Sequence, residues 1–122
     1  METNRIDLLE YRGVKSTMFT GRPQGEQVRK KLNFDSVDNS SKKIILEIPT
    51  GTTSFNPSFF LGLLFDSISK LGIEEFKQKY EFDLSNVDSE FKTIINDDIE
   101  DGMRHAKNSI NPNFGLESFF ND

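Results

Sequence analysis

The side chains that could do chemistry together lie near the C-terminal end of the sequence. Asp97, Asp101 and His105 are spaced four apart, so they share one face of a predicted helix. Two carboxylates and an imidazole could hold a divalent cation there, or one carboxylate could orient the histidine. Solvated helix faces show the same spacing, and no loop of the calcium-binding type accompanies it. We therefore expect neither a metal site nor a catalytic site.

Other catalytic patterns are missing. The sequence has no G-x-S-x-G motif and a single histidine, so a serine nucleophile lacks a nearby base. It has no cysteine, which excludes disulfides, thiolate catalysis and cysteine-based zinc sites. The segment TGRPQGE at 20–26 lacks the lysine and the glycine spacing of a phosphate-binding loop. We expect a protein that is not an enzyme and that uses no cofactor.

The charge and the hydropathy limit the partners. The chain carries 20 acidic and 15 basic side chains, a formal net charge of -5. One group of basic residues could form a stripe: Arg22, Arg29, Lys30, Lys31, Lys42 and Lys43. No aromatic residues interleave with it, so a solvated helix face is expected rather than nucleic-acid binding. The polar N-terminal segment and the lack of an apolar run near 18 residues predict no membrane association and a cytoplasmic protein.

A hydroxyl-rich turn connects the most apolar strand to the most apolar helix. Residues 44–48 are rich in isoleucine and predict a buried strand. Residues 58–71 predict a helix, with Asn56 as its N-cap and Gly72 as its C-cap. The turn between them contains Thr52, Thr53 and Ser54.

The rest of the chain alternates between the two types of element. We predict strands at 5–11 and 14–19, paired as a hairpin, and another at 80–84; helices at 23–32, 73–80 and 88–106; and a connection at 33–41. This order predicts an α/β domain with a mixed sheet of four to five strands and helices mainly on one face. One domain is expected at 1–107 and a C-terminal tail at 108–122. The tail contains four large apolar residues: Phe114, Leu116, Phe119 and Phe120.

The central helix is apolar nearly all round. One face is predicted to be core: Leu61, Leu64, Phe65, Ile68 and Leu71. Phe59 and Leu63 lie opposite, and if that side meets solvent they form an apolar docking surface beside the helix start. The alternative is that the tail or a neighbouring loop covers them.

Three segments carry a resemblance to a known family. They are TGRPQGE at 20–26, TSFNPSFFLG at 53–62, and KLG at 70–72 followed by EF at 75–76. Together they resemble a bacterial STAS-like domain family of unknown function, over about residues 5–105. That family is similar to the STAS domains of sulphate transporters and anti-sigma-factor antagonists. The resemblance implies a single STAS-like domain.

In anti-sigma-factor antagonists, a partner kinase phosphorylates a serine in the corresponding turn. The resemblance places that serine at Ser58. A phosphate there would add charge at a helix N-terminus, which favours anions. This chain departs from the antagonists' Asp-Ser-Ser-Gly pattern at three positions, with Asn56 and Pro57 before the serine and Phe59 after it. Recognition by such a kinase is correspondingly in question.

These observations predict a regulatory, protein-binding domain with Ser58 as phosphoacceptor. The expected partner is a protein, with a serine-kinase-type ATPase as one class, and the pattern also permits a homo-oligomer. The predicted partner-binding residues are Arg22, Thr53, Ser54, Asn56, Phe59 and Leu63. The alternative is a constitutive interaction module that uses the central-helix surface and the tail without phosphorylation.

Overall fold

The computed structural model describes residues 2–13 and 15–110. Its elements follow in the order β1 (Thr3–Asp7), η1 (Leu9–Tyr11), β2 (Met18–Phe19), α1 (Arg22–Leu32), α2 (Phe34–Asp38), β3 (Lys43–Glu47), β4 (Ser54–Phe55), α3 (Pro57–Leu71), α4 (Ile73–Lys79), β5 (Tyr80–Asp83) and α5 (Ser89–Ile110). The predicted α/β class is confirmed. Within these residues no helix has both the length and the apolar character needed to cross a bilayer.

The strands form two parallel sheets. β3 lies between β1 and β5 in the larger sheet, and β2 pairs with β4 in the smaller one. The prediction of one mixed sheet differs from this arrangement, because every strand pair among the described residues is parallel. The predicted hairpin at 5–11 and 14–19 is wrong for the same reason. β1 and β2 each pair with a strand that follows α2 in the chain, β3 and β4 respectively.

Two consecutive units share one order of elements. β1, β2, α1 and α2 are followed by β3, β4, α3 and α4, and the corresponding strands pair side by side. Each unit has two helices in succession, separated by a residue of positive φ. These residues are Asn33, with φ 56°, and Gly72, with φ 80°. The positive φ turns the chain out of the first helix and lets the next begin at once, and at Asn33 the conformation is left-handed helical.

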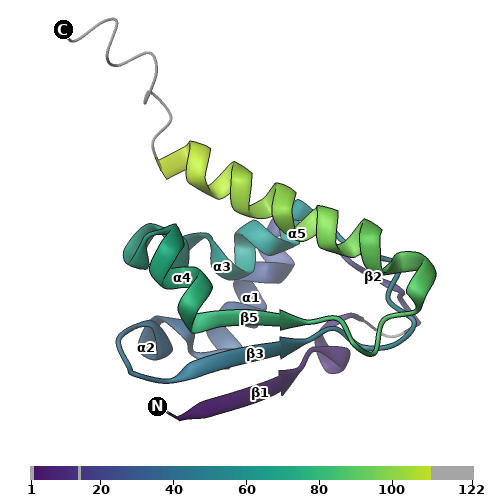
Figure 1. The fold of residues 1–122 in the computed structure, drawn as a ribbon, viewed down its shortest axis with the longest axis horizontal. Coiled ribbons are helices and arrows are strands. Elements are labelled where there is room, and N and C mark those ends of the chain that lie inside the picture. The colour runs from purple at the N-terminus through teal and green to yellow at the C-terminus, as the bar shows by residue number, and fades with distance from the viewer. Residues whose placement is uncertain (1, 14, 111–122) are drawn as a thin grey trace, which may run out of the picture.

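The larger sheet has one buried face. Ile44 and Leu46 of β3 are buried, whereas Ile45 and Glu47 point the other way and are half-buried. On that second face Arg5 of β1 donates hydrogen bonds to Glu47 and to Asp83 of β5. Figure 1 shows the three strands side by side, with α5 passing along the β5 side. The sheet therefore has an apolar side and a charged side.

Helix α3 is the centre of the core. It packs against α1, α2, α4 and α5. Its contact with α1 is very close, because a Cβ placed on Gly62 would lie 2.1 Å from the carbonyl oxygen of Arg22. A Cβ on Gly25 would lie 2.3 Å from the carbonyl oxygen of Phe59. Glycine at both positions lets the two helix backbones touch.

Of the two alternatives for Phe59 and Leu63, exposure to solvent is wrong. Phe59 is 1% exposed and Leu63 is fully buried. The Phe59 ring lies 5.2 Å from the ring of Phe19 and 5.3 Å from that of Phe55, measured between centroids. Residues of β2, β4 and α1 thus cover the side of α3 that was expected to face solvent, and no apolar docking surface exists there.

Other boundaries shift modestly. Helix α2 occupies part of the predicted connection at 33–41. Helix α5 extends to Ile110, beyond the predicted end at 106, and its Ile94 is 48% exposed. The tail residues Phe114 to Phe120 lie outside the described part of the chain.

Candidate functional site

The strongest candidate site is the place where two helices begin side by side. β2 ends at Phe19 and α1 begins at Arg22, while β4 ends at Phe55 and α3 begins at Pro57. Because β2 and β4 are parallel neighbours, the two helix starts follow them to the same end of the small sheet. The Asn56 N–H donates to the Phe19 carbonyl at 2.9 Å, which holds the C-terminal ends of β2 and β4 together.

Ser58 ties these two helix starts to each other. Its hydroxyl donates to Oδ1 of Asn56 at 2.7 Å and accepts from the N–H of Gly21, the residue before α1, at 3.2 Å. Oδ1 of Asn56 also accepts from the Ser58 N–H at 2.8 Å, so the predicted N-cap is confirmed. Ser58 is half-buried. Its side chain belongs to the contact between the helices and also borders solvent.

Helix polarity makes this place favourable for negative charge. The first N–H groups of a helix lack intrahelical partners and carry partial positive charge. Neither α1 nor α3 has an acidic residue in its first turn, and the start of α1 has no side-chain cap. Arg22 is exposed at the start of α1, with its guanidinium carbon 5.4 Å from the centroid of the Phe65 ring.

The hydroxyl residues of the turn have different roles. Thr53 is joined to Thr17 by a contact of 3.0 Å between their hydroxyls, and its N–H donates to the Thr17 carbonyl at 2.8 Å. Ser54 donates to a carboxylate oxygen of Asp98 on α5 at 3.3 Å. Thr52 is fully buried and donates to the Pro49 carbonyl. Thr53 and Ser54 are half-buried and border solvent, whereas Thr52 has a structural role in the turn.

Two polar residues at this turn were not expected from the sequence. Nη1 of Arg12 donates to the Thr50 carbonyl at 2.9 Å and to the Thr52 hydroxyl at 2.8 Å. Asp98 accepts from the Phe55 N–H at 3.1 Å as well as from Ser54. Neither residue has a local sequence signal, because each acts on a segment far away in the chain.

The structure thus divides the predicted partner-binding residues into two groups. Arg22 and Asn56 lie at the helix starts with Ser58, Thr53 and Ser54 lie at the beginning of β4 beside Thr17 and Asp98, and all four are exposed or half-buried. Phe59 and Leu63 follow in the same helix but lie in the core. We use the name helix-start surface for the first group together with Ser58.

A second polar cluster is buried behind α1. Arg29 was expected on a solvated face, yet its side chain is only 6% exposed. Its guanidinium donates to Asp35, to Asp38, to the hydroxyl of Ser67 and to the Leu63 carbonyl. The hydroxyl of Tyr80 donates to the other carboxylate oxygen of Asp38 at 2.6 Å. The cluster joins α1, α2, α3 and β5.

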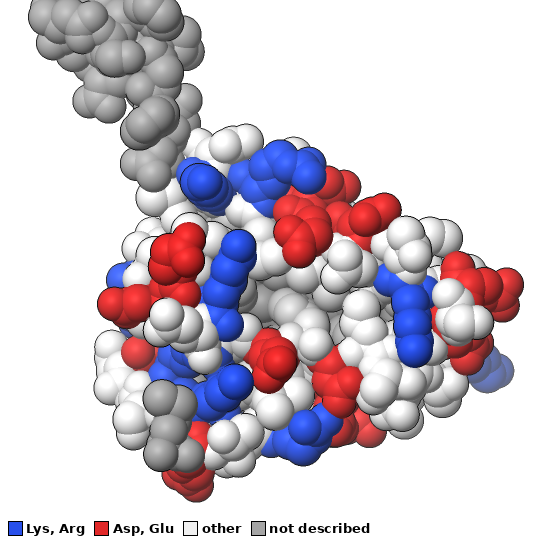
Figure 2. Space-filling model, in the orientation of Figure 1, with Lys and Arg blue, Asp and Glu red and all other residues white. Residues whose placement is uncertain are grey.

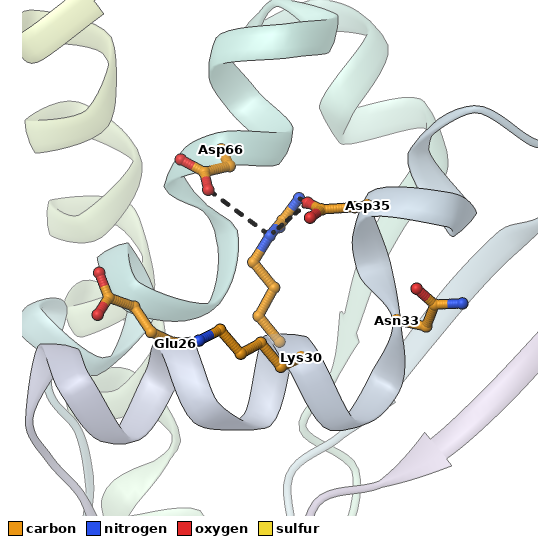
Figure 3. A pocket seen from close by; sticks show the side chains of 6 residues that line it. Glu26, Lys30, Asn33, Asp35 and Asp66 are labelled. Atoms are coloured by element: carbon orange, nitrogen blue, oxygen red, sulfur yellow. Dashed lines mark hydrogen bonds and ion pairs between the residues drawn. The ribbon is translucent and has the colours of Figure 1, made fainter.

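The outer side of this cluster is a hollow of about 450 Å³. Figure 3 shows Glu26, Lys30, Asn33, Asp35 and Asp66 around it. Arg29 lines it as well. The guanidinium already binds Asp35 and Asp38, and Asp66 lies 3.9 Å away. Because these carboxylates occupy it, Arg29 is not available to an anionic ligand.

The pKa values follow from these contacts. Burial opposes the charge on Arg29, but hydrogen bonds to Asp35 and Asp38 outweigh this effect and raise its pKa. The hydrogen bond from Arg29 lowers the pKa of Asp35. Burial, and then the hydrogen bond to Asp38, raise the pKa of the Tyr80 hydroxyl well above its usual value. Arg29 thus stays charged and Tyr80 stays neutral over the physiological range.

Asp97, Asp101 and His105, the acidic and imidazole side chains spaced four apart in the sequence, lie on α5. Asp101 accepts from Nη1 of Arg104 at 2.6 Å, so one of its oxygens is already paired. In the ranges 2–13 and 15–110, no group of three His, Asp or Glu side chains is arranged to hold a metal ion. On the face seen in Figure 2, basic and acidic side chains alternate rather than gather into a single-sign patch.

Comparisons of this chain with protein-family models, with curated proteins and with solved structures found no match.

Proposed function

We propose that this chain is a non-enzymatic, regulatory protein-binding domain of the STAS-like type, controlled by phosphorylation of Ser58. The observation that supports the proposal is the position of the Ser58 hydroxyl. It borders solvent at the junction of two helix starts and makes one hydrogen bond to each side. A modification of this one oxygen acts on both helices.

The reaction is a phosphoryl transfer from ATP, catalysed by the partner. The Ser58 oxygen forms a bond to the γ-phosphorus, the bond from that phosphorus to the β-phosphate bridge breaks, and ADP and the hydroxyl proton leave. The product carries about -1.5 to -2 charge and three acceptor oxygens. The N–H groups at the starts of α1 and α3, together with Arg22, favour that charge.

Phosphorylation also removes a donor that the fold uses. Ser58 loses the O–H that it donates to Asn56, and the added group competes for the Gly21 N–H. The helix-start surface then changes in charge and in shape together. A partner that recognises Arg22, Thr53, Ser54 and Asn56 in the unmodified protein is expected to be released. A serine-kinase-type ATPase is the partner class that the STAS resemblance implies.

The test compares substitutions that mimic the two states. Affinity for the partner captured from the host cell should be lower for Ser58→Asp than for Ser58→Ala. The matched pair Ser69→Asp and Ser69→Ala, at an exposed position of the same helix, should show equal affinities. Mass spectrometry of the protein from the same cells should find phosphate on the peptide that contains Ser58.

Equal affinity of the two Ser58 variants would remove the switch and leave a constitutive module. Loss of partner binding in Ser58→Ala alone would indicate a destabilised helix start rather than a missing phosphate. That change removes two hydrogen bonds worth about 1 kcal/mol each. Thermal melting of every variant separates a loss of binding from a loss of stability.

A further inference from the structure

The larger sheet has an open edge beside a groove. β5 pairs with β3 on one side, and no strand of the described segments pairs with the other side. Between that edge and α5 lies a groove of about 330 Å³. Its apolar lining comes from Phe76, Tyr80, Phe82, Leu84, Ile99 and Met103. Figure 2 shows a hollow with uncharged walls in this region, rimmed by charged side chains.

The backbone at this edge is positioned to accept another strand. The Ile48 N–H donates to the Asp83 carbonyl, so the polar groups of Asp83 face β3. Backbone groups alternate in direction along a strand, so the N–H and C=O of Phe82 face the open side. An extended segment can pair with them and place alternate side chains into the groove.

The order of the elements indicates where the next strand belongs. β1 is followed by helices and then by β3 at its side, and β3 is followed by helices and then by β5 at its side. Helix α5 follows β5 in the same way. Parallel crossovers share one hand in nearly all proteins. A strand after α5, joined with that hand, reaches the open edge of β5.

The sequence beyond Ile110 has the composition for such a strand. Residues 111–113 read Asn-Pro-Asn, which suits the short connection found between a helix and a strand. Phe114, Leu116 and Phe120 then fall on one side of an extended chain, with Phe119 on the other. Residues 114–120 extend over about 23 Å at 3.3 Å per residue, enough to follow all of β5.

We propose that residues 114–120 of this same chain bind along the open edge of β5 as a fourth parallel strand. Phe114 and Leu116 fill the groove between β5 and α5, and the backbone pairs with Phe82. This inference goes beyond the proposed function, since it assigns an occupant to a surface away from Ser58. It also assigns the apolar tail to the fold rather than to a partner.

The test uses tryptophan as a reporter, because the full chain contains none. Phe114→Trp should emit at a shorter wavelength than Phe119→Trp, since only the first side chain enters the groove. Adding Met103→Lys, which places a charge in the groove lining, should shift the Phe114→Trp emission toward that of tryptophan in water. The matched control Met18→Lys, at a methionine that is 43% exposed outside the groove, should leave it unchanged.

Hydrogen exchange gives a second measurement without a tryptophan. The Phe82 amide should be protected in the unaltered chain and should exchange faster in Met103→Lys. Water-like emission of Phe114→Trp would overturn the proposal, as would short-wavelength emission that Met103→Lys leaves unchanged. Short-wavelength emission or protection of the Phe82 amide could also appear only at concentrations where the chain dimerises. That result would assign the groove to a second copy and would equally overturn the proposal. If Met103→Lys does not fold, the comparison of Phe114→Trp with Phe119→Trp decides whether the proposal holds.

Discussion

Arg29 shows how a charged side chain can belong to a protein interior. Moving a guanidinium out of water is costly, and the cost is offset only when its donors and its charge are matched. Here Asp35 and Asp38 supply the opposite charge, and Ser67 and the Leu63 carbonyl take further donors. The four partners come from two helices, so the cluster orients α2 against α3.

Replacing Arg29 tests this account. Arg29→Met leaves the buried carboxylate of Asp38 without its cation, and we expect a loss of about 3–5 kcal/mol in the free energy of unfolding. Urea denaturation measures it. The control Lys30→Met, at the exposed neighbouring residue, should change stability by at most about 0.5 kcal/mol. A loss below about 1 kcal/mol for Arg29→Met would mean that the cluster does not hold the fold.

Tyr80 provides a pH test of the same cluster. Its pKa is raised in the folded state, so its contribution to stability is complete below the unfolded value of about 10. That contribution is lost as the pH rises from there toward the folded value, because the unfolded chain releases the proton more readily. Phenolate absorbance should show Tyr80 titrating only above its usual range, with Tyr80→Phe lacking this component. If the component that Tyr80→Phe removes titrated near pH 10 in the folded protein, it would contradict the buried hydrogen bond from Tyr80 to Asp38.

The sequence could predict the polar residues that act locally. Asn56 was expected as an N-cap, because its side chain bonds a backbone N–H two residues later. The hydrogen bond from Gly21 to Ser58 and the burial of Arg29 could not be predicted, since each depends on which helix lies alongside. A basic residue in a basic run gives no sign that a distant carboxylate will meet it.

At the scale of elements, the contact between α1 and α3 depends on two glycines. A methyl group on Gly62 would meet the backbone of Arg22, and one on Gly25 would meet the backbone of α3. Backbone atoms cannot rotate aside as a long side chain can. Either substitution therefore forces the two helices apart along their whole contact.

Gly62→Ala tests this close approach. Alanine favours a helix over glycine by about 1 kcal/mol, but we expect overpacking to win and stability to fall by about 1–3 kcal/mol. The matched change in the same helix is Ser69→Ala, at an exposed site where no clash arises. Thermal or urea unfolding measures both. A Gly62→Ala variant more stable than the parent would show that α1 and α3 are farther apart than described.

Element types were easier to predict from the sequence than element partners. Apolar spacing located the helices near α1, α3, α4 and α5 and the strands near β3 and β5. It placed β1 and β2 in a hairpin, because spacing within one segment does not identify the strand that will pair with it. It also missed α2, whose short helix contains only Phe34 and Val37 as apolar residues.

At the scale of the molecule, both sheets share one hydrophobic core. Phe55 of β4 contacts the ring of Phe82 on β5 at 5.6 Å between centroids, which joins the small sheet to the large one. Helix α3 packs on four other helices of the same core. No group of elements in the described chain can therefore lose its packing while the rest keeps it.

Unfolding should accordingly be a single cooperative transition. Tyrosine fluorescence reports on Tyr11 in η1 and on Tyr80 in β5, while far-UV circular dichroism reports mainly on the helices. The urea midpoints from the two probes should coincide. An early change in tyrosine fluorescence with the helical signal retained would show that unfolding is not a single transition.

The pairing of β1 with β3 also bears on how the nascent chain folds during translation. Thr3 pairs with Lys43, and Gly25 meets Gly62, so the first unit leaves the ribosome before β3 and α3, against which it packs. Its apolar side chains stay uncovered until β3 and α3 emerge. A slow stretch of codons or a bound chaperone in that interval would matter more here than in a protein whose N-terminal strands form their own hairpin.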